Sequence, residues 1–138
     1  MLEPNKDLEH IFEQAIQLAS VNDHEYVTLE HFLYSMLNND SFVELLNAFG
    51  ADVKSLKDDV ENYITNELKD IVNTEVDRPK KTNTVDRMLN RAFTQVLFSG
   101  RNHVQVIDIF LSIASETNSH ASYFFIKYGL EQIGRAHV

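Results

Sequence analysis

Apolar residues recur at spacings of three and four along most of the chain. This spacing places them on one face of a helix, whereas a half-buried strand would show strict alternation. Polar segments interrupt the pattern and separate the predicted helices from one another. The apolar stripes lie over residues 8–19, 29–37, 43–49, 53–68, 85–97, 106–114 and 121–128.

Short polar side chains precede several stripes and are predicted to cap the helices, because their oxygens can accept from free backbone N–H groups. Thr28, Asp52 and Thr84 stand at such positions. Ser41, followed three residues later by Glu44, has the spacing of a capping box. These features together predict an all-α fold.

The two halves of the chain match one another at a separation of 77 residues, which indicates an internal repeat. Ala15 is matched by Ala92, and Val27 by Val104. The polar segment between the halves is predicted to be a linker. We therefore expect two tandem four-helix repeats with pseudo-twofold symmetry. The expected boundaries are 1–68 for repeat 1, 69–83 for the linker and 84–131 for an incomplete repeat 2.

The last helix of repeat 2 is predicted to be missing, because the chain ends near the point where that helix should begin. Residues 133–138 match a translation of a common sequencing adapter, so 132–138 is interpreted as a non-native tail; a natural short tail is the alternative. Phe124, Phe125 and Tyr128 are predicted to belong to the core rather than to a peptide groove. Without a covering helix they would partly face water and destabilise repeat 2.

Acidic residues outnumber basic ones, 21 against 12, and the formal net charge is −9. Nucleic-acid binding is therefore not expected, because it requires basic surface that displaces counterions. The absence of cysteine excludes disulfides and thiolate metal sites. No apolar run approaches the roughly 18 residues of a membrane helix, and the N-terminus lacks the features of a signal peptide. We expect a cytoplasmic location and no membrane partner.

No catalytic machinery is predicted. None of the four glycines precedes a lysine, so the chain has no phosphate-binding Gly-Lys-Ser/Thr loop. No nucleophile–base pair or carboxylate pair has a convincing spacing. The chain is expected to bind other molecules rather than to be an enzyme.

Short motifs carry a resemblance to a known family. The string His-Glu-Tyr-Val-Thr-Leu-Glu-His-Phe-Leu occupies 24–33, with Phe32 where the family has an aliphatic residue. Together with the repeated four-helix pattern, it resembles the N-terminal domain of the Clp ATPases, which are AAA+ unfoldases. Gly-Arg-Asn-His-Val at 100–104 and Ala-Ser-Tyr-Phe-Phe at 121–125 are similar to the ClpA branch. The resemblance covers about 7–131.

The resemblance implies an adaptor- and substrate-docking domain that serves ATP-dependent proteolysis. In the ClpA branch this domain docks the adaptor ClpS and helps to engage substrate proteins. A ClpP-type protease would be reached through the parent hexamer, and ATP and magnesium are expected only in modules absent from this chain. The family's adaptor contacts fall on Glu25, Glu30 and Thr82. A freestanding Clp-N-like regulator or decoy without ATPase modules is the alternative.

Some of these residues also have a purely structural interpretation. Glu30 lies in the first turn of a predicted helix, where a carboxylate stabilises the helix dipole by ~0.3–1 kcal/mol. Arg101 and Asn102 form either a polar rim for a partner or part of a tight turn beside Gly100.

No metal site is predicted. His24 and His31 do not have the His-Glu-x-x-His spacing that places two zinc ligands on one helical face. His31 is expected to be partly buried and hydrogen-bonded near the junction of the repeats. An incidental zinc ion bound through His24 or His103 is the minor alternative.

Overall fold

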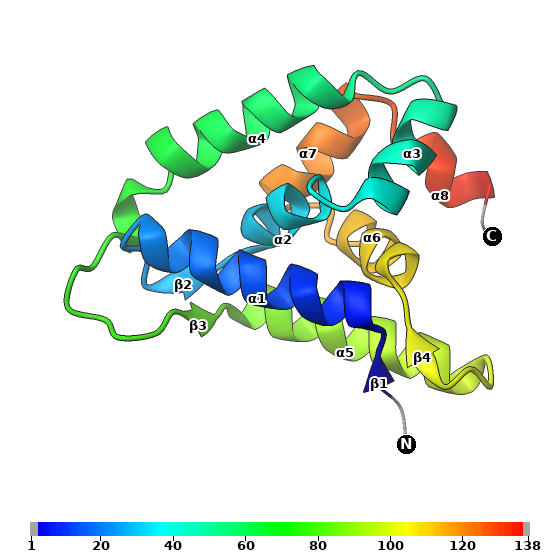
Figure 1. The fold of residues 1–138 in the computed structure, drawn as a ribbon, viewed down its shortest axis with the longest axis horizontal. Coiled ribbons are helices and arrows are strands. Elements are labelled where there is room, and N and C mark those ends of the chain that lie inside the picture. The colour runs from blue at the N-terminus through cyan, green and yellow to red at the C-terminus, as the bar shows by residue number, and fades with distance from the viewer. Residues whose placement is uncertain (1–2, 137–138) are drawn as a thin grey trace.

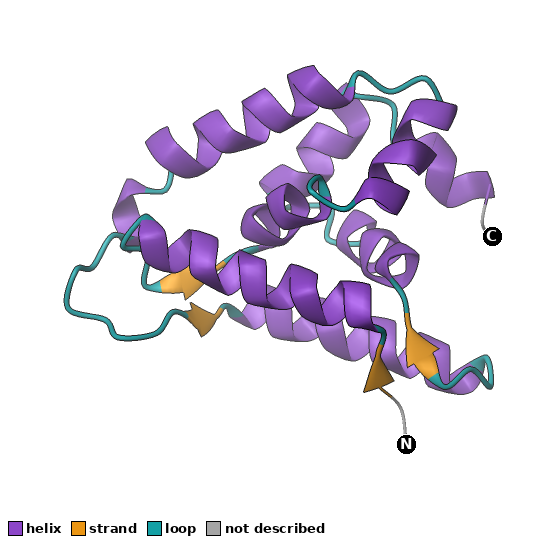
Figure 2. Cartoon of the chain, viewed as in Figure 1, coloured by secondary structure: helices purple, strands orange, loops and turns teal. Residues whose placement is uncertain are grey.

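The structure is a computed structural model that describes the backbone of residues 3–136 and the side chains of residues 3–133. The described part is mostly helical (Figure 2), which confirms the predicted all-α class. None of its helices is both long and apolar enough to cross a membrane. The helices, labelled in Figure 1, are α1 (Lys6–Val21), α2 (Leu29–Met36), α3 (Asp40–Ala48), α4 (Val53–Asn66), the 3₁₀ turn η1 (Lys69–Ile71), α5 (Asn83–Phe98), α6 (Val106–Ala114), α7 (His120–Lys127) and α8 (Glu131–Ala136).

Two pairs of two-residue parallel strands join the repeats. β2 (Tyr26–Val27) pairs with β3 (Lys80–Lys81), and β1 (Glu3–Pro4) pairs with β4 (His103–Val104). The first residues of β1 and β3 are 77 positions apart, and so are those of β2 and β4. The strand before the first helix of each repeat therefore pairs with the strand between the first two helices of the other repeat. Strands of this length have no alternation that a sequence pattern could reveal.

Within each repeat, the first two helices are joined by the same buried contact. In repeat 1 the Oγ of Ser35 donates to the carbonyl oxygen of Ile11 at 2.8 Å. In repeat 2 the Oγ of Ser112 donates to the carbonyl oxygen of Met88 at 2.7 Å. Both residues of the second pair lie 77 positions after those of the first. The predicted repeat therefore holds at the level of single hydrogen bonds.

The repeats share one core, built around three phenylalanine rings. The ring centroids of Phe42 and Phe110 are 5.5 Å apart, and Phe110 stacks on Phe125 at 4.8 Å. Phe124 and Phe125 are only 3% and 2% exposed. The prediction that this aromatic stripe partly faces water is therefore wrong for both residues.

The prediction that the last helix is missing is also wrong, because α8 forms, with six residues against 14 in α4. Leu130 and Ile133 at its start are fully buried in the shared core. Burial of a large apolar side chain contributes ~1.5–3 kcal/mol, which favours this short helix despite its length. The non-native origin of residues 132–138 stays a prediction, although Ile133 belongs to the core; residues 137–138 lie outside the described part.

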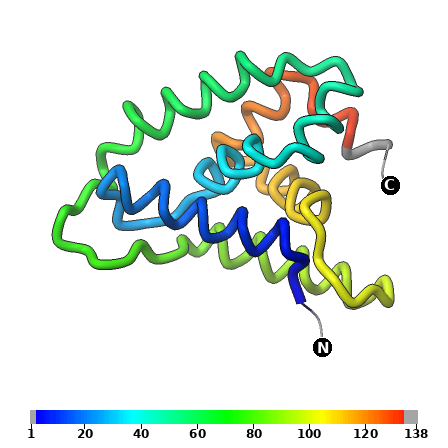
Figure 3. Tube along the Cα trace, viewed as in Figure 1, coloured from blue at the N-terminus to red at the C-terminus, as the bar shows by residue number. Residues whose placement is uncertain are grey.

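The segment predicted as a linker, 69–83, is held against repeat 1 before and after a loop at one end of the molecule (Figure 3). Val72 forms an isolated antiparallel bridge with His24, and the N–H of Asn73 donates to the carbonyl oxygen of Asp23 at 2.7 Å. Strand β3 then pairs with β2. The boundaries between repeats and linker stay a prediction.

The predicted helix starts are confirmed for α2 and α4 and wrong for α3. Thr28 and Asp52 accept hydrogen bonds at the starts of α2 and α4. Helix α3 is capped by Asn39, whose side chain accepts from the N–H of Phe42 at 2.9 Å. The predicted capping box that begins at Ser41 is therefore wrong, since the helix starts earlier in the chain.

Helix α5 is capped by Thr82 rather than by Thr84, because the Oγ1 of Thr82 accepts from the N–H of Val85 at 3.1 Å. We expect Thr82→Ala to lower the free energy of unfolding by about 1 kcal/mol, the usual value of a lost cap. Thr84→Ala, the same change two residues later, should cost less than ~0.5 kcal/mol. Urea unfolding of both variants measures this, and equal effects would contradict the assignment of the cap.

Candidate docking site

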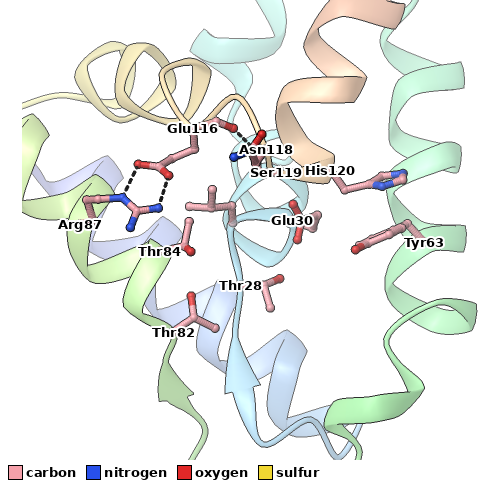
Figure 4. A pocket seen from close by; sticks show the side chains of 11 residues that line it. Thr28, Glu30, Tyr63, Thr82, Thr84, Arg87, Glu116, Asn118, Ser119 and His120 are labelled. Atoms are coloured by element: carbon pink, nitrogen blue, oxygen red, sulfur yellow. Dashed lines mark hydrogen bonds and ion pairs between the residues drawn. The ribbon is translucent and has the colours of Figure 1, made fainter.

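A cavity of about 300 Å³ lies where the two repeats meet (Figure 4). One wall is formed by the start of α2, and the facing walls come from the start of α5 and from the turn between α6 and α7. Most of the lining side chains are polar. They are Thr28, Leu29, Glu30, Tyr63, Thr82, Thr84, Arg87, Glu116, Asn118, Ser119 and His120.

The pairing of β2 with β3 places two residues of the predicted adaptor site, Glu25 and Thr82, on adjoining backbone segments. The N–H of Lys80 donates to the carbonyl oxygen of Glu25 at 2.9 Å, and the N–H of Thr82 donates to that of Val27 at 3.3 Å. Thr82 and Glu30 both line the cavity, whereas Glu25 lies on the adjoining strand connection and does not. Their contact with an adaptor stays a prediction, but their proximity is a property of the fold.

Glu30 lies at the cavity wall and is only 6% exposed. Its Oε2 accepts from the N–H of Ala121 at 2.8 Å, so this carboxylate stabilises the first turn of α7 in the other repeat. Burial raises the pKa of Glu30, and the bonds from Ala121, its own N–H and Thr28 oppose that rise. The expected dipole interaction thus extends to a second helix, and Glu30 ties α2 to α7.

An ion-pair cluster forms the opposite wall, and the sequence analysis missed it. Glu116 receives two hydrogen bonds from Arg87, at 3.0 and 2.5 Å, and one from Arg91 at 2.6 Å. These bonds, those from Arg87 first, lower the pKa of Glu116 to about 2. The spacing of the arginines, four residues apart on one helical face, was the available signal. Arg87 is still largely exposed, so its guanidinium also faces the solvent side of the cavity.

An aromatic pair closes the side of the cavity nearest α4. The rings of Tyr63 and His120 are stacked, with centroids 4.1 Å apart and planes at 16°. Burial, and then the charges of Glu30 and Glu67, raise the pKa of Tyr63 to about 12. The same two rings line a further cavity of about 530 Å³ between α4 and α7.

The structure does not bring Arg101 and Asn102 to this cavity. They follow α5, whereas Thr82 precedes it, and a 16-residue helix is about 24 Å long. Arg101 makes two hydrogen bonds to Asp108, at 3.1 and 2.6 Å. The carbonyl oxygen of Asn102 accepts from the N–H of Glu3 at 3.1 Å. Both residues therefore contribute to the turn and to the β1–β4 pairing.

His31 is hydrogen-bonded, as expected, but it is fully buried rather than partly buried. Its Nδ1 accepts from the N–H of Thr28 at 2.9 Å, which places the proton of neutral His31 on Nε2. That Nε2 is 2.9 Å from Nδ1 of His24 and donates to it. Burial, and then the neighbouring His24, lower the pKa of His31 to about 3. Among the described residues there is no cluster of three side chains able to hold a metal ion.

A groove of about 710 Å³ lies along α1 and α5, and apolar side chains share its lining with the charged residues Glu13, Arg78, Lys80, Lys81 and Asp86. Phe12 and Ile16 line it from α1, and Leu89 and Phe93, their equivalents 77 positions later, line it from α5. All four residues lie within the predicted apolar stripes over 8–19 and 85–97, yet the structure leaves them only partly buried. Their position at the edge of the apolar stripe, in both repeats, could have indicated this partial exposure.

The chain matches the Clp repeat (R) N-terminal domain family over residues 3–128. It is 30% identical over 118 residues to a ClpA homolog protein of Fuscovulum blasticum. That match covers 85% of this chain and 15% of the relative, so the chain spans a small part of the relative's length.

Solved structures with the same fold include the Hsp104 N-terminal domain from Candida albicans, with a TM-score of 0.82 and 14% identity, over 92% of this chain and 82% of that one. The complex of the ClpV N-domain with a VipB peptide gives a TM-score of 0.68 and 23% identity, over 91% of this chain and 76% of that one. At these identities the likeness concerns the fold alone. Because the family match spans both repeats, the chain belongs to the Clp repeat (R) N-terminal domain family.

Proposed function

We propose that this chain is the N-terminal adaptor- and substrate-docking domain of a ClpA-like AAA+ unfoldase that works in cytoplasmic ATP-dependent proteolysis. The observation that carries the proposal is that Glu30 and Thr82 line one cavity, while the β2–β3 pairing places the backbone of Glu25 beside that of Lys80, two residues before Thr82. The ClpA homolog among its relatives supports it. ATP and magnesium would be bound by other modules, and a ClpP-type protease would act through the parent hexamer.

The three residues have different parts in this docking surface. Glu30 is buried and bonded to Ala121, and the hydroxyl of Thr82 caps α5, so both mainly hold the surface in shape. Glu25 is half-buried, as is Thr82, but its carboxylate takes part in neither of those contacts and can therefore face a partner. With a net charge of −9 on the chain, the site favours an adaptor with a basic contact surface.

We assign direct engagement of substrates to the groove along α1 and α5. Unfolded substrate segments expose apolar side chains, and the partly buried Phe12, Ile16, Leu89 and Phe93 offer them a matching surface. The complex of the ClpV N-domain with a VipB peptide is a precedent for peptide binding by a domain of this fold. Tethering a substrate here raises its effective concentration at the unfolding ring.

Titration of the chain with a ClpS-type adaptor tests the proposal. We expect saturable binding that Glu25→Lys weakens at least tenfold, about 1.4 kcal/mol, because a carboxylate is replaced by a like charge facing basic surface. Glu44→Lys makes the same change in charge on exposed α3, away from the site, and should change the affinity less than about twofold.

Two outcomes contradict the adaptor proposal. One is the absence of binding by a chain whose circular dichroism shows it to be folded. The other is an equal loss in the Glu25→Lys and Glu44→Lys variants, which would show a general effect of charge rather than a docking site.

A further inference from the structure

A cavity of about 310 Å³ lies within repeat 1, and none of the motif residues lines it. It is formed by the first turns of α1 and by the end of α2 together with the start of α3. The 77-residue separation gives this cavity a counterpart in repeat 2. Ser35 is matched by a serine in repeat 2, whereas His10 and Gln14 are replaced by arginines there. Its lining residues are Asp7, His10, Ile11, Gln14, Ser35, Asn38, Asn39, Asp40 and Ser41.

In repeat 2 the counterpart position is filled by the guanidinium group of an arginine. Nε of Arg91 donates to Oγ of Ser112 at 3.0 Å, and its Nη2 donates to the carbonyl oxygen of Ser112 at 2.7 Å and to Glu116 at 2.6 Å. Arg87 fills the neighbouring space and is paired with the same carboxylate. The packing of these helices therefore creates a position that accepts a planar group with several N–H donors.

Repeat 1 keeps the acceptor but lacks the arginines. Ser35 is equivalent to Ser112, is 1% exposed, and donates to Ile11 just as Ser112 donates to Met88. Its hydroxyl and its carbonyl group therefore have the arrangement that holds Arg91 in repeat 2. Oε1 of Gln14 lies 3.5 Å from Oγ of Ser35, so the Gln14 side chain must move aside when a ligand binds there. Shorter side chains replace the two arginines and leave the volume of the cavity open: Gln14 stands for Arg91, and His10 for Arg87. Asn39 stands for Glu116, the carboxylate partner of both arginines.

The charge of the cavity also suits a cation. Asp7 and Asp40 line it, and none of the lining residues is lysine or arginine. The ammonium group of Lys57 donates to Oδ1 of Asn38 at 2.7 Å, so this acceptor is occupied and one positive charge lies at the edge of the cavity. The two carboxylates of Asp7 and Asp40 outnumber that single charge. The partial positive charge at the start of α3 opposes a cation, but the side chain of Asn39 caps it and Asp40 follows in the first turn.

We propose that this cavity binds the guanidinium group of an arginine side chain presented by a partner polypeptide. The guanidinium lies against Ser35 as that of Arg91 lies against Ser112, and Asp7 and Asp40 supply the charge that Glu116 supplies in repeat 2. A guanidinium fits better than an ammonium group, because its planar fork serves two adjacent acceptors at once. The inference does not depend on the proposed adaptor site, which uses other residues.

Titration of three capped tripeptides followed by ¹⁵N-resolved NMR tests this proposal. The probes are Gly-Arg-Gly, Gly-citrulline-Gly and Gly-Lys-Gly, in which citrulline keeps the shape of arginine without its charge. We expect Gly-Arg-Gly to shift the amide signals of Gln14, Ser35 and Asp40. The citrulline peptide should bind at least about tenfold more weakly, and the lysine peptide about threefold more weakly.

Two matched pairs of variants locate the site. Gln14→Arg introduces the residue of repeat 2, should fill the cavity, and should weaken Gly-Arg-Gly binding at least tenfold. Gln17→Arg adds the same charge on an exposed part of α1 outside this cavity and should change it less than twofold. Asp7→Asn should weaken binding severalfold, and Glu9→Gln in the same helical turn should not.

Three results would overturn the proposal. The first is equal binding of the arginine and citrulline peptides. The second is unchanged Gly-Arg-Gly binding by a folded Gln14→Arg variant. The third is binding whose signal shifts lie elsewhere on the chain, such as around Glu25.

Discussion

The substitution Phe110→Ala is expected to lower the free energy of unfolding by about 3–5 kcal/mol, the range for removal of a large buried aromatic side chain. Phe110 is fully buried, and its ring lies between Phe42 of repeat 1 and Phe125 of repeat 2. Its removal leaves a cavity at the point where the two repeats share their core. Since small domains are stable by only about 5–15 kcal/mol, this change should remove a large part of the total stability.

Denaturant unfolding followed by both fluorescence and circular dichroism measures this effect. Phe98→Ala is the matched control, because Phe98 is 84% exposed and should contribute less than ~0.5 kcal/mol. The two probes should report one coincident transition, because the shared aromatic rings couple the repeats. Separate transitions, or equal effects of the two substitutions, would contradict a common core.

Acidification from pH 6.5 to 5 is expected to lower the free energy of unfolding by about 2 kcal/mol through His31. The pKa of this histidine falls from 6.5 to about 3 in the folded chain, so the unfolded state binds the extra proton first. The stability that neutral His31 provides is fully present above pH 6.5 and is lost as the pH falls toward about 3. Each pH unit in this window costs up to about 1.4 kcal/mol.

The hydrogen bonds of His31 explain why its protonation is unfavourable in the folded chain. Protonated His31 would direct an N–H at the N–H of Thr28 and so disrupt the start of α2. The pKa of His24 is lowered as well, chiefly by its burial and against the charge of Asp23, so it contributes in the same direction.

Urea unfolding at several pH values measures the slope, and NMR titration of the imidazole signals measures the pKa of His31 without any substitution. A His31 signal that titrates near 6.5, or a flat stability profile across this window, would contradict the prediction.

The start of α5 shows what local sequence leaves undecided. Thr82 and Thr84 have the same side chain and stand two residues apart, so propensity cannot choose between them. The pairing of β3 with β2 fixes the backbone just before Thr82 and thereby decides which threonine caps the helix. At α8, the burial of Leu130 and Ile133 in the shared core was likewise invisible to helical periodicity.

The candidate docking site, too, could be predicted from the sequence only in part. The motif led to Glu25, Glu30 and Thr82, but the sequence did not indicate that Glu30 bonds Ala121 of the other repeat. Nor did it show that Arg101, in the connector after α5, forms an ion pair with Asp108 in the first turn of α6. The first contact depends on how the two repeats are arranged, and the second on the geometry of the turn that joins α5 to α6.

The sequence by itself determined helices α1 to α7, the 77-residue repeat and the absence of thiol chemistry, because these depend on periodicity and residue type along the chain. Only the tertiary structure decided the exchanged strands, the cavity between the repeats, and the contrast between the occupied position at Ser112 and the open one at Ser35. The physical reason is that these features arise from contacts between residues distant in the chain, which minimise the free energy of the whole fold rather than of any one segment.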